Sequence, residues 1–165
     1  MNGGSAAKSE LRWRYGPNVT DVYGAGIFCE TNATVSNCVV TACFSFVSGG
    51  GGYQGNYYNC AFISNTAEYF GGGALDSTLV NCTLTGNLQV NDYGSGGGAS
   101  SCTLNNCTLI GNLSQANDNG NGPGTGGGGA AYLSVLNNCE LIQNTASTGG
   151  GTCLGSLNNC LIVSN

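Results

Sequence analysis

Short runs of alternating apolar and polar residues recur at regular intervals along the chain. In Cys82-Thr83-Leu84-Thr85 and Cys107-Thr108-Leu109-Ile110, the cysteine and the residue two places later fall on one face of an extended strand. Turn-forming Asn and Gly residues lie on both sides of these runs. The pattern predicts strands of about four to six residues and does not fit a helix.

The runs belong to an internal repeat that is marked by the dipeptide Asn-Cys. Its cysteines are Cys38, Cys60, Cys82, Cys107, Cys139 and Cys160, which are almost evenly spaced apart from one longer interval before Cys107 and a still longer one before Cys139. The second position after each cysteine is apolar: Val40, Phe62, Leu84, Leu109, Leu141 and Ile162. Such a period predicts a solenoid, in which each coil buries its inward side chains against its neighbours.

Two further marks keep step with the cysteines. The fifth residue after the cysteine is Asn65, Asn87, Asn112, Asn144 and Asn165, and only Cys43 breaks the rule. Glycine runs end at Gly26, Gly52, Gly73, Gly98, Gly129 and Gly151, and the interval from Gly98 to Gly129 is again the longest. Because the series lengthen and shorten together, the long intervals indicate loop insertions within one register.

These marks predict an all-β fold, a right-handed parallel β-helix of about six coils of roughly 22 residues with two or three strands each. Equivalent residues of neighbouring coils then stack about 4.8 Å apart as cysteine, aliphatic and asparagine ladders. Asparagine suits the bends because it tolerates a left-handed backbone and its amide can hydrogen-bond along the stack. Residues 21–165 form the predicted helix, and residues 1–20 lie outside the repeat as a possible cap or assembly arm.

The repeat resembles those of known bacterial proteins. Gly72-Gly73-Ala74-Leu75 and Phe62-Ile63-Ser64-Asn65 are similar to the GGA[ILV] and FxxN motifs of polymorphic outer-membrane proteins. The Asn-Asn-Cys-x-Leu form looks more like large β-helix proteins of environmental bacteria, within the pectate-lyase-like superfamily. The resemblance covers about residues 21–165, and it implies an extracellular or cell-surface location and a stalk or adhesin role.

Composition narrows the possible partners. Charged residues are 7 % of the chain, against about 25 % in an average soluble domain. The three basic residues, Lys8, Arg12 and Arg14, all precede Asp21, which argues against binding nucleic acid. No apolar stretch has the length of a membrane span.

The candidate catalytic chemistry is sparse. Polysaccharide lyases and hydrolases need clustered or paired acids, often with a basic residue, whereas the acids here fall in different columns of the repeat. We therefore expect no enzyme activity, no catalytic residue and no cofactor. A metal site is not expected either, because histidine is absent and no cysteines are spaced two to four residues apart.

The ten cysteines allow two interpretations. The six ladder cysteines act as small apolar core residues, or neighbouring rungs form disulfide bonds, since stacked Cα atoms lie within the permitted separation. The off-ladder cysteines Cys29, Cys43, Cys102 and Cys153 are better candidates for disulfide bonds than the ladder cysteines.

Function is expected on the outward side chains. The third residue after each cysteine forms a β-branched stripe, a possible association face: Thr41, Ile63, Thr85, Ile110, Ile142 and Val163. We expect a structural or adhesive protein that associates with itself into filaments or surface assemblies. The alternative is a module that binds or cleaves carbohydrate, with possible ligand contacts from the loop residues Tyr69, Phe70, Asp92 and Tyr93 and from Tyr53, Tyr57 and Tyr58 of the second coil.

Overall fold

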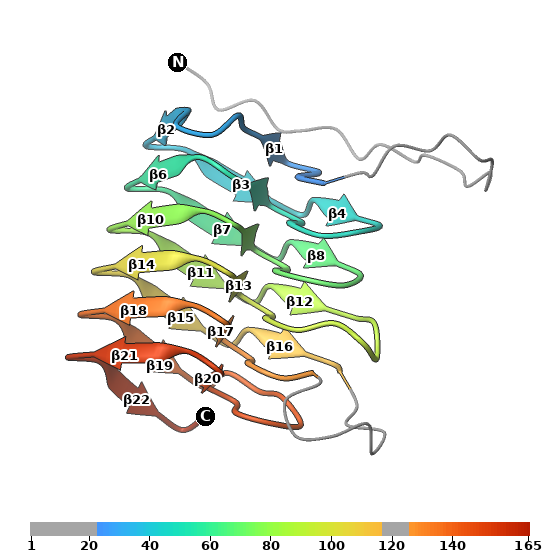
Figure 1. Ribbon diagram of the computed structural model, residues 1–165, viewed down its shortest axis with the longest axis vertical. Coiled ribbons are helices and arrows are strands. Elements are labelled where there is room, and N and C mark those ends of the chain that lie inside the picture. Colours follow the sequence, from blue (N-terminus) through green and yellow to red (C-terminus); the bar gives the residue numbers. More distant parts are fainter. Residues whose placement is uncertain (1–22, 117–125) are drawn as a thin grey trace.

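The computed structural model describes residues 23–116 and 126–165, and these residues form a parallel β-solenoid without helices (Figure 1). The predicted arm at residues 1–20 lies outside the described residues. Short strands stack in parallel into four sheets, which we number 1 to 4 in the order in which the chain passes through them. The predicted fold class is therefore confirmed.

The bounds of the strands follow the repeat. Sheet 1 contains β1 (Ile27–Phe28), β5 (Gly52–Tyr53), β9 (Ala74–Leu75), β13 (Ala99–Ser100), β17 (Ala131–Tyr132) and β20 (Thr152–Cys153). Sheet 2 contains β2 (Thr34–Ser36), β6 (Asn56–Tyr58), β10 (Thr78–Val80), β14 (Thr103–Asn105), β18 (Val135–Asn137) and β21 (Ser156–Asn158). Sheet 3 contains β3 (Val39–Thr41), β7 (Ala61–Ile63), β11 (Thr83–Thr85), β15 (Thr108–Ile110), β19 (Glu140–Ile142) and β22 (Leu161–Val163). Sheet 4 contains β4 (Phe44–Ser45), β8 (Thr66–Ala67), β12 (Leu88–Gln89) and β16 (Leu113–Ser114).

Each coil begins with its strand in sheet 1, so β1 opens coil 1 and β20 opens coil 6. Coils 1 to 4 contain four strands each, more than the two or three expected from the sequence. The strands of sheets 1 and 4 have only two residues and thus show no alternating pattern that a sequence could reveal. The strands of sheets 2 and 3 have three residues, and the pattern there is clear.

The predicted register is confirmed across both insertions. Leu84 pairs with Leu109 and Leu109 with Leu141, although each of these two intervals contains an insertion. The additional residues lie in the connections from sheet 4 back to sheet 1, which follow β12 and β16 (Figure 1). Insertions at this edge leave the stacked strands unchanged.

The bends between the strands share one design. At the bend from sheet 2 to sheet 3, the asparagine before each ladder cysteine has φ between 50° and 55°. At the bend from sheet 3 to sheet 4, the left-handed residue is the one before the ladder asparagine, for example Ser64 or Gly86. Only the first asparagine series therefore supplies the left-handed conformation, and the second series has a different task.

That task is to accept a backbone hydrogen bond from the coil before. The Asn65 N–H donates to Oδ1 of Asn87, at 3.0 Å, and the Asn87 N–H donates to Oδ1 of Asn112, at 3.0 Å. The amide nitrogen of Asn87 in turn donates to the carbonyl of Phe62, at 2.9 Å. Asn65, Asn87, Asn112 and Asn144 are fully buried, so the ladder satisfies polar groups that water does not reach.

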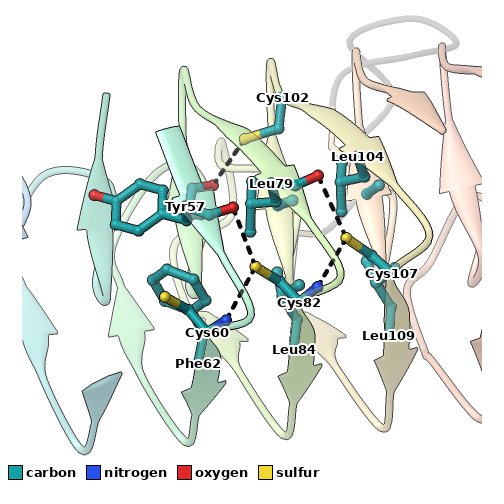
Figure 2. Close-up of a cluster of buried hydrophobic side chains, with 14 of the residues drawn as sticks. Tyr57, Cys60, Phe62, Leu79, Cys82, Leu84, Cys102, Leu104, Cys107 and Leu109 are labelled. Atoms are coloured by element: carbon teal, nitrogen blue, oxygen red, sulfur yellow. Dashed lines mark hydrogen bonds between the residues drawn. The ribbon is translucent and has the colours of Figure 1, made fainter. Parts of the chain in front are cut away.

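The core is a single column of stacked side chains. In coils 3 to 5 each layer contains two fully buried leucines, such as Leu79 and Leu84, together with a ladder cysteine (Figure 2). Coil 2 replaces the leucines with Tyr57 and Phe62, whose rings meet edge to face at 5.1 Å. The aliphatic ladder is buried from Val40 to Leu141, whereas Ile162, in the last strand of sheet 3, is 50 % exposed.

Candidate functional site

The outer side of sheet 3 carries the predicted stripe. Thr41, Ile63, Thr85, Ile110, Ile142 and Val163 occupy one column, each paired in register with the next. A second outward column, two residues earlier in each strand, contains Val39, Ala61, Thr83, Thr108, Glu140 and Leu161. We call these two columns the sheet 3 face.

The sheet 3 face is nearly uncharged, and seven of its twelve residues are apolar. Val39 is 64 % exposed and Leu161 54 % exposed, and Glu140 is the only charged residue in the two columns. Alternation places both columns outside because the residue between them, such as Leu84, is fully buried. The sequence correctly predicted this alignment, because three-residue strands preserve the period of two.

A second feature lies on the outer side of sheet 1. A cavity of about 370 Å³, which we call the aromatic groove, is lined by Tyr23, Val47, Ser48, Tyr53, Tyr69, Phe70, Leu75, Asp76, Ser100, Ser101, Tyr132 and Leu133. Tyr23 stacks on Tyr53 with ring centroids 4.8 Å apart. The groove therefore offers several aromatic surfaces and a few polar groups from neighbouring coils.

The structure brings together some of the predicted ligand residues and separates others. Tyr69 and Phe70 line the aromatic groove, and so does Tyr53. Asp92 and Tyr93 are not among its lining residues, and Tyr93 is 70 % exposed. Tyr57 is fully buried in the core, where its hydroxyl hydrogen-bonds to Sγ of Cys29 at 3.6 Å.

The sequence did not reveal Tyr132 or Asp76 as neighbours of these residues. Tyr53 and Tyr132 belong to one outward column of sheet 1, linked through Leu75 and Ser100. Tyr53 directly follows the last glycine of its run, whereas Tyr132 comes three residues after Gly129. Counting from the glycine runs therefore places the two tyrosines out of register, and only the strand pairing aligns them.

Asp76 is the one carboxylate among the lining residues of the groove. It has φ 50° at the bend from sheet 1 to sheet 2, and its side chain is exposed. The protein atoms around it still remove part of its hydration, which raises the pKa of the carboxyl. A paired carboxylate of the kind that glycosidases use is absent from this lining.

The cysteine ladder lies at the bend between sheets 2 and 3. Cys60, Cys82, Cys107 and Cys139 are buried, and Cys38 and Cys160 at the two ends are half-buried. The Cys60 N–H donates to Sγ of Cys82 at 3.4 Å, and the Cys82 N–H donates to Sγ of Cys107 at 3.4 Å. Sulfur thus takes the place that Oδ1 has in the asparagine ladder.

All ten cysteines are free thiols in the structure. The off-ladder cysteines, the better disulfide candidates, are free as well: Cys29 and Cys43 belong to coil 1, Cys102 to coil 4 and Cys153 to coil 6. Burial raises the pKa of Cys102 to about 12. Cys102 occupies a third kind of bend, where its N–H donates to Oγ of Ser134 at 3.1 Å.

Hydrogen bonds between neighbouring thiols shift the pKa values of the ladder cysteines in opposite directions. Those to Cys139 and Cys82, together with burial, raise the pKa of Cys107. The same contacts with Cys107 lower the pKa of Cys82 and of Cys139 to about 7. Cys107 therefore keeps its proton, and its neighbours are the stronger thiolate candidates.

Comparisons with known proteins do not identify a family for this chain. No family model, no curated protein and no solved structure matches the chain. In residues 23–116 and 126–165, no helix is long and apolar enough to span a membrane. Across the same residues, no three or more His, Cys, Asp or Glu side chains converge as they would around a metal ion.

Proposed function

We propose that this chain is a non-catalytic structural β-solenoid that associates with copies of itself through the sheet 3 face. The observation that carries the proposal is the continuity of this face, which runs in register over all six coils with one charged residue. Parallel sheets in proteins are usually covered on both sides, and large uncovered apolar faces mark interaction sites. A second copy of the same face is a fitting cover, because its columns repeat with the same strand spacing.

The location follows from the resemblance noted in the sequence. Repeats similar to those of polymorphic outer-membrane proteins support a place at the bacterial surface or outside the cell. The fold supports a passive role there, since a stack of uniform coils provides length and stiffness. We therefore propose an adhesive or filament-forming role at the surface, as for solenoids similar to those of the pectate-lyase-like superfamily.

The test compares two substitutions in coil 4 that both point outward. Ile110→Lys places a charge in the sheet 3 face, and Thr103→Lys places the same charge on the outer side of sheet 2. We expect the wild-type chain and Thr103→Lys to form concentration-dependent oligomers or filaments in sedimentation velocity and electron micrographs. Ile110→Lys should remain monomeric. A wild-type chain that stays monomeric at all concentrations would refute self-association.

The aromatic groove supports a second candidate, a carbohydrate-binding module. Sugar rings have apolar faces and polar edges, and the groove pairs tyrosine rings with the exposed Asp76 carboxylate and the exposed Ser101 hydroxyl. Tyr132→Ala should then abolish retardation in affinity electrophoresis through polysaccharide gels. Tyr93→Ala, which lies outside the groove, is the matched control and should leave retardation unchanged. Release of sugar product would favour a cleaving module instead.

A further inference from the structure

The sulfur atoms of the cysteine ladder form a regular row through the protein. Each ladder cysteine directly precedes a strand of sheet 3, and those strands pair in register, as Ala61 with Thr83 does. Neighbouring sulfurs are therefore separated by one strand spacing, about 4.8 Å. Figure 2 shows the sulfurs of Cys60, Cys82 and Cys107 in a straight line with the same orientation.

The surroundings of this row are uncharged. The fully buried side chains beside it are leucines, Tyr57 and Phe62, and the buried polar side chains of the described residues are Ser, Asn and Gln only. An isolated ion with net charge would be costly in such a core. Any species bound between the sulfurs must therefore be electrically neutral together with its ligands.

We propose that pairs of neighbouring ladder cysteines bind soft monovalent metal ions of the Cu(I) class, with one ion between two sulfurs. Two metal–sulfur bonds of about 2.3 Å, the length of a zinc–thiolate bond, span about 4.6 Å in a line, which is close to the strand spacing. Soft ions select sulfur ligands. The backbone thus provides the separation that a linear two-coordinate ion needs.

The binding step balances in charge. The ion displaces the proton of one thiol and forms a metal–thiolate bond, and the released proton goes to solvent. The second sulfur remains a neutral thiol and donates a lone pair to the ion, so the bound group carries no net charge.

Two observations separate this site from a zinc site. Structural zinc takes four ligands, and no group of three candidate ligands converges in residues 23–116 and 126–165. The chain also lacks histidine. A two-coordinate ion needs only the two sulfurs that stacking supplies, although each comes from a different repeat of the sequence.

The experiment compares two triple variants with equal numbers of thiols. The alternate-rung variant combines Cys60→Ser, Cys107→Ser and Cys160→Ser, so that no two neighbouring ladder positions keep a cysteine. The intact-ladder variant combines Cys29→Ser, Cys102→Ser and Cys153→Ser, and it keeps all six ladder cysteines. Serine is a suitable replacement at these bends, because Ser134 already accepts the N–H of Cys102 at an equivalent corner. The full chain is refolded with Ag(I), a soft monovalent probe, then challenged with excess glutathione and weighed by native mass spectrometry.

We expect wild type and the variant with the intact ladder to retain about three ions, one for each pair of six rungs. The variant with alternate rungs should retain none. The proposal is overturned if wild type retains no ions, if the intact-ladder variant loses them, or if the alternate-rung variant retains as many as wild type. Should circular dichroism show that the alternate-rung variant does not fold, Cys82→Ser decides, since it should lower the count from three to two.

Discussion

At the scale of the residue, the bends on either side of sheet 3 combine two requirements in two consecutive positions. The first residue takes a left-handed backbone, and the second turns its side chain inward and accepts an N–H from the coil before. Asn, Cys and Ser all serve in the second position, because Oδ1, Sγ and Oγ can each accept this hydrogen bond. Cys43, the exception in the asparagine series, leads into the first strand of sheet 4 in the described residues, and its N–H donates to Oδ1 of Asn65 at 3.1 Å.

A buried ladder asparagine should therefore be hard to replace. Asn87→Ala leaves the Asn65 N–H and the Phe62 carbonyl without their side-chain partners in the core. With about 1–3 kcal/mol for each buried group, we expect a loss of about 3 kcal/mol in the free energy of unfolding, measured in urea. Asn81→Gly is the control, since glycine adopts its φ of 54° and its side chain is exposed. A loss below about 1 kcal/mol for Asn87→Ala would contradict this account of the ladder.

At the scale of the element, the inward side chains of neighbouring sheets are matched in size within each coil. Inward positions of sheet 1 are Ala74, Ala99 and Ala131 where sheets 2 and 3 contribute leucines, but Gly52 where they contribute Tyr57 and Phe62. A Cβ at Gly52 would lie 2.8 Å from the Tyr57 hydroxyl oxygen and 3.1 Å from the Phe62 ring. The larger side chains of coil 2 are accommodated because this glycine leaves room for them.

Gly52→Ala should consequently destabilise the wild-type chain by about 1–3 kcal/mol through overpacking. In a background with Tyr57→Leu and Phe62→Leu, the same change recreates the composition of coil 3 and should stabilise the fold. Chemical unfolding of the four variants measures the coupling directly. Equal effects of Gly52→Ala in both backgrounds would show that the rings and the glycine are independent.

At the scale of the whole molecule, stability depends on neighbouring coils and hardly on the lengths of their connections. The longest connection joins β16 to β17, and its described ends lie together: a Cβ at Gly126 would be 2.6 Å from that of Ala116. The strand pairs on either side keep their register. The solenoid thus tolerates loops of different length at one edge, because the strands on either side of a loop still pair in register.

Replacement of residues 117–125 by two glycines should then leave the fold intact. We expect Tm to change by only a few degrees, because the paired strand residues that the structure describes all lie outside the removed segment. Differential scanning calorimetry and the circular dichroism spectrum provide the measurement. Loss of the cooperative transition would mean that the connection itself holds coils 4 and 5 in register.

The sequence alone determined the repeat, the stacking of its marks and the outward stripe. These features are carried by single positions at near-constant spacing, such as Cys82 and Leu84, and strand periodicity fixes on which face each one lies. The inward aliphatic ladder and the burial of the central cysteines were predicted correctly for the same reason. The four-strand coils were not, since two-residue strands have no period.

Only the tertiary structure decided what the stacked positions do together. It aligned Tyr53 with Tyr132, and both line the aromatic groove beside Tyr69 and Asp76. Counting from the glycine runs does not align these two tyrosines, because the runs end at different distances from them. It also showed how the stacked cysteines interact, since the Cys60 N–H donates to Sγ of Cys82. The physical reason is that hydrogen bonds between the coils set the register of sheet 1, and glycine runs of unequal length do not mark that register.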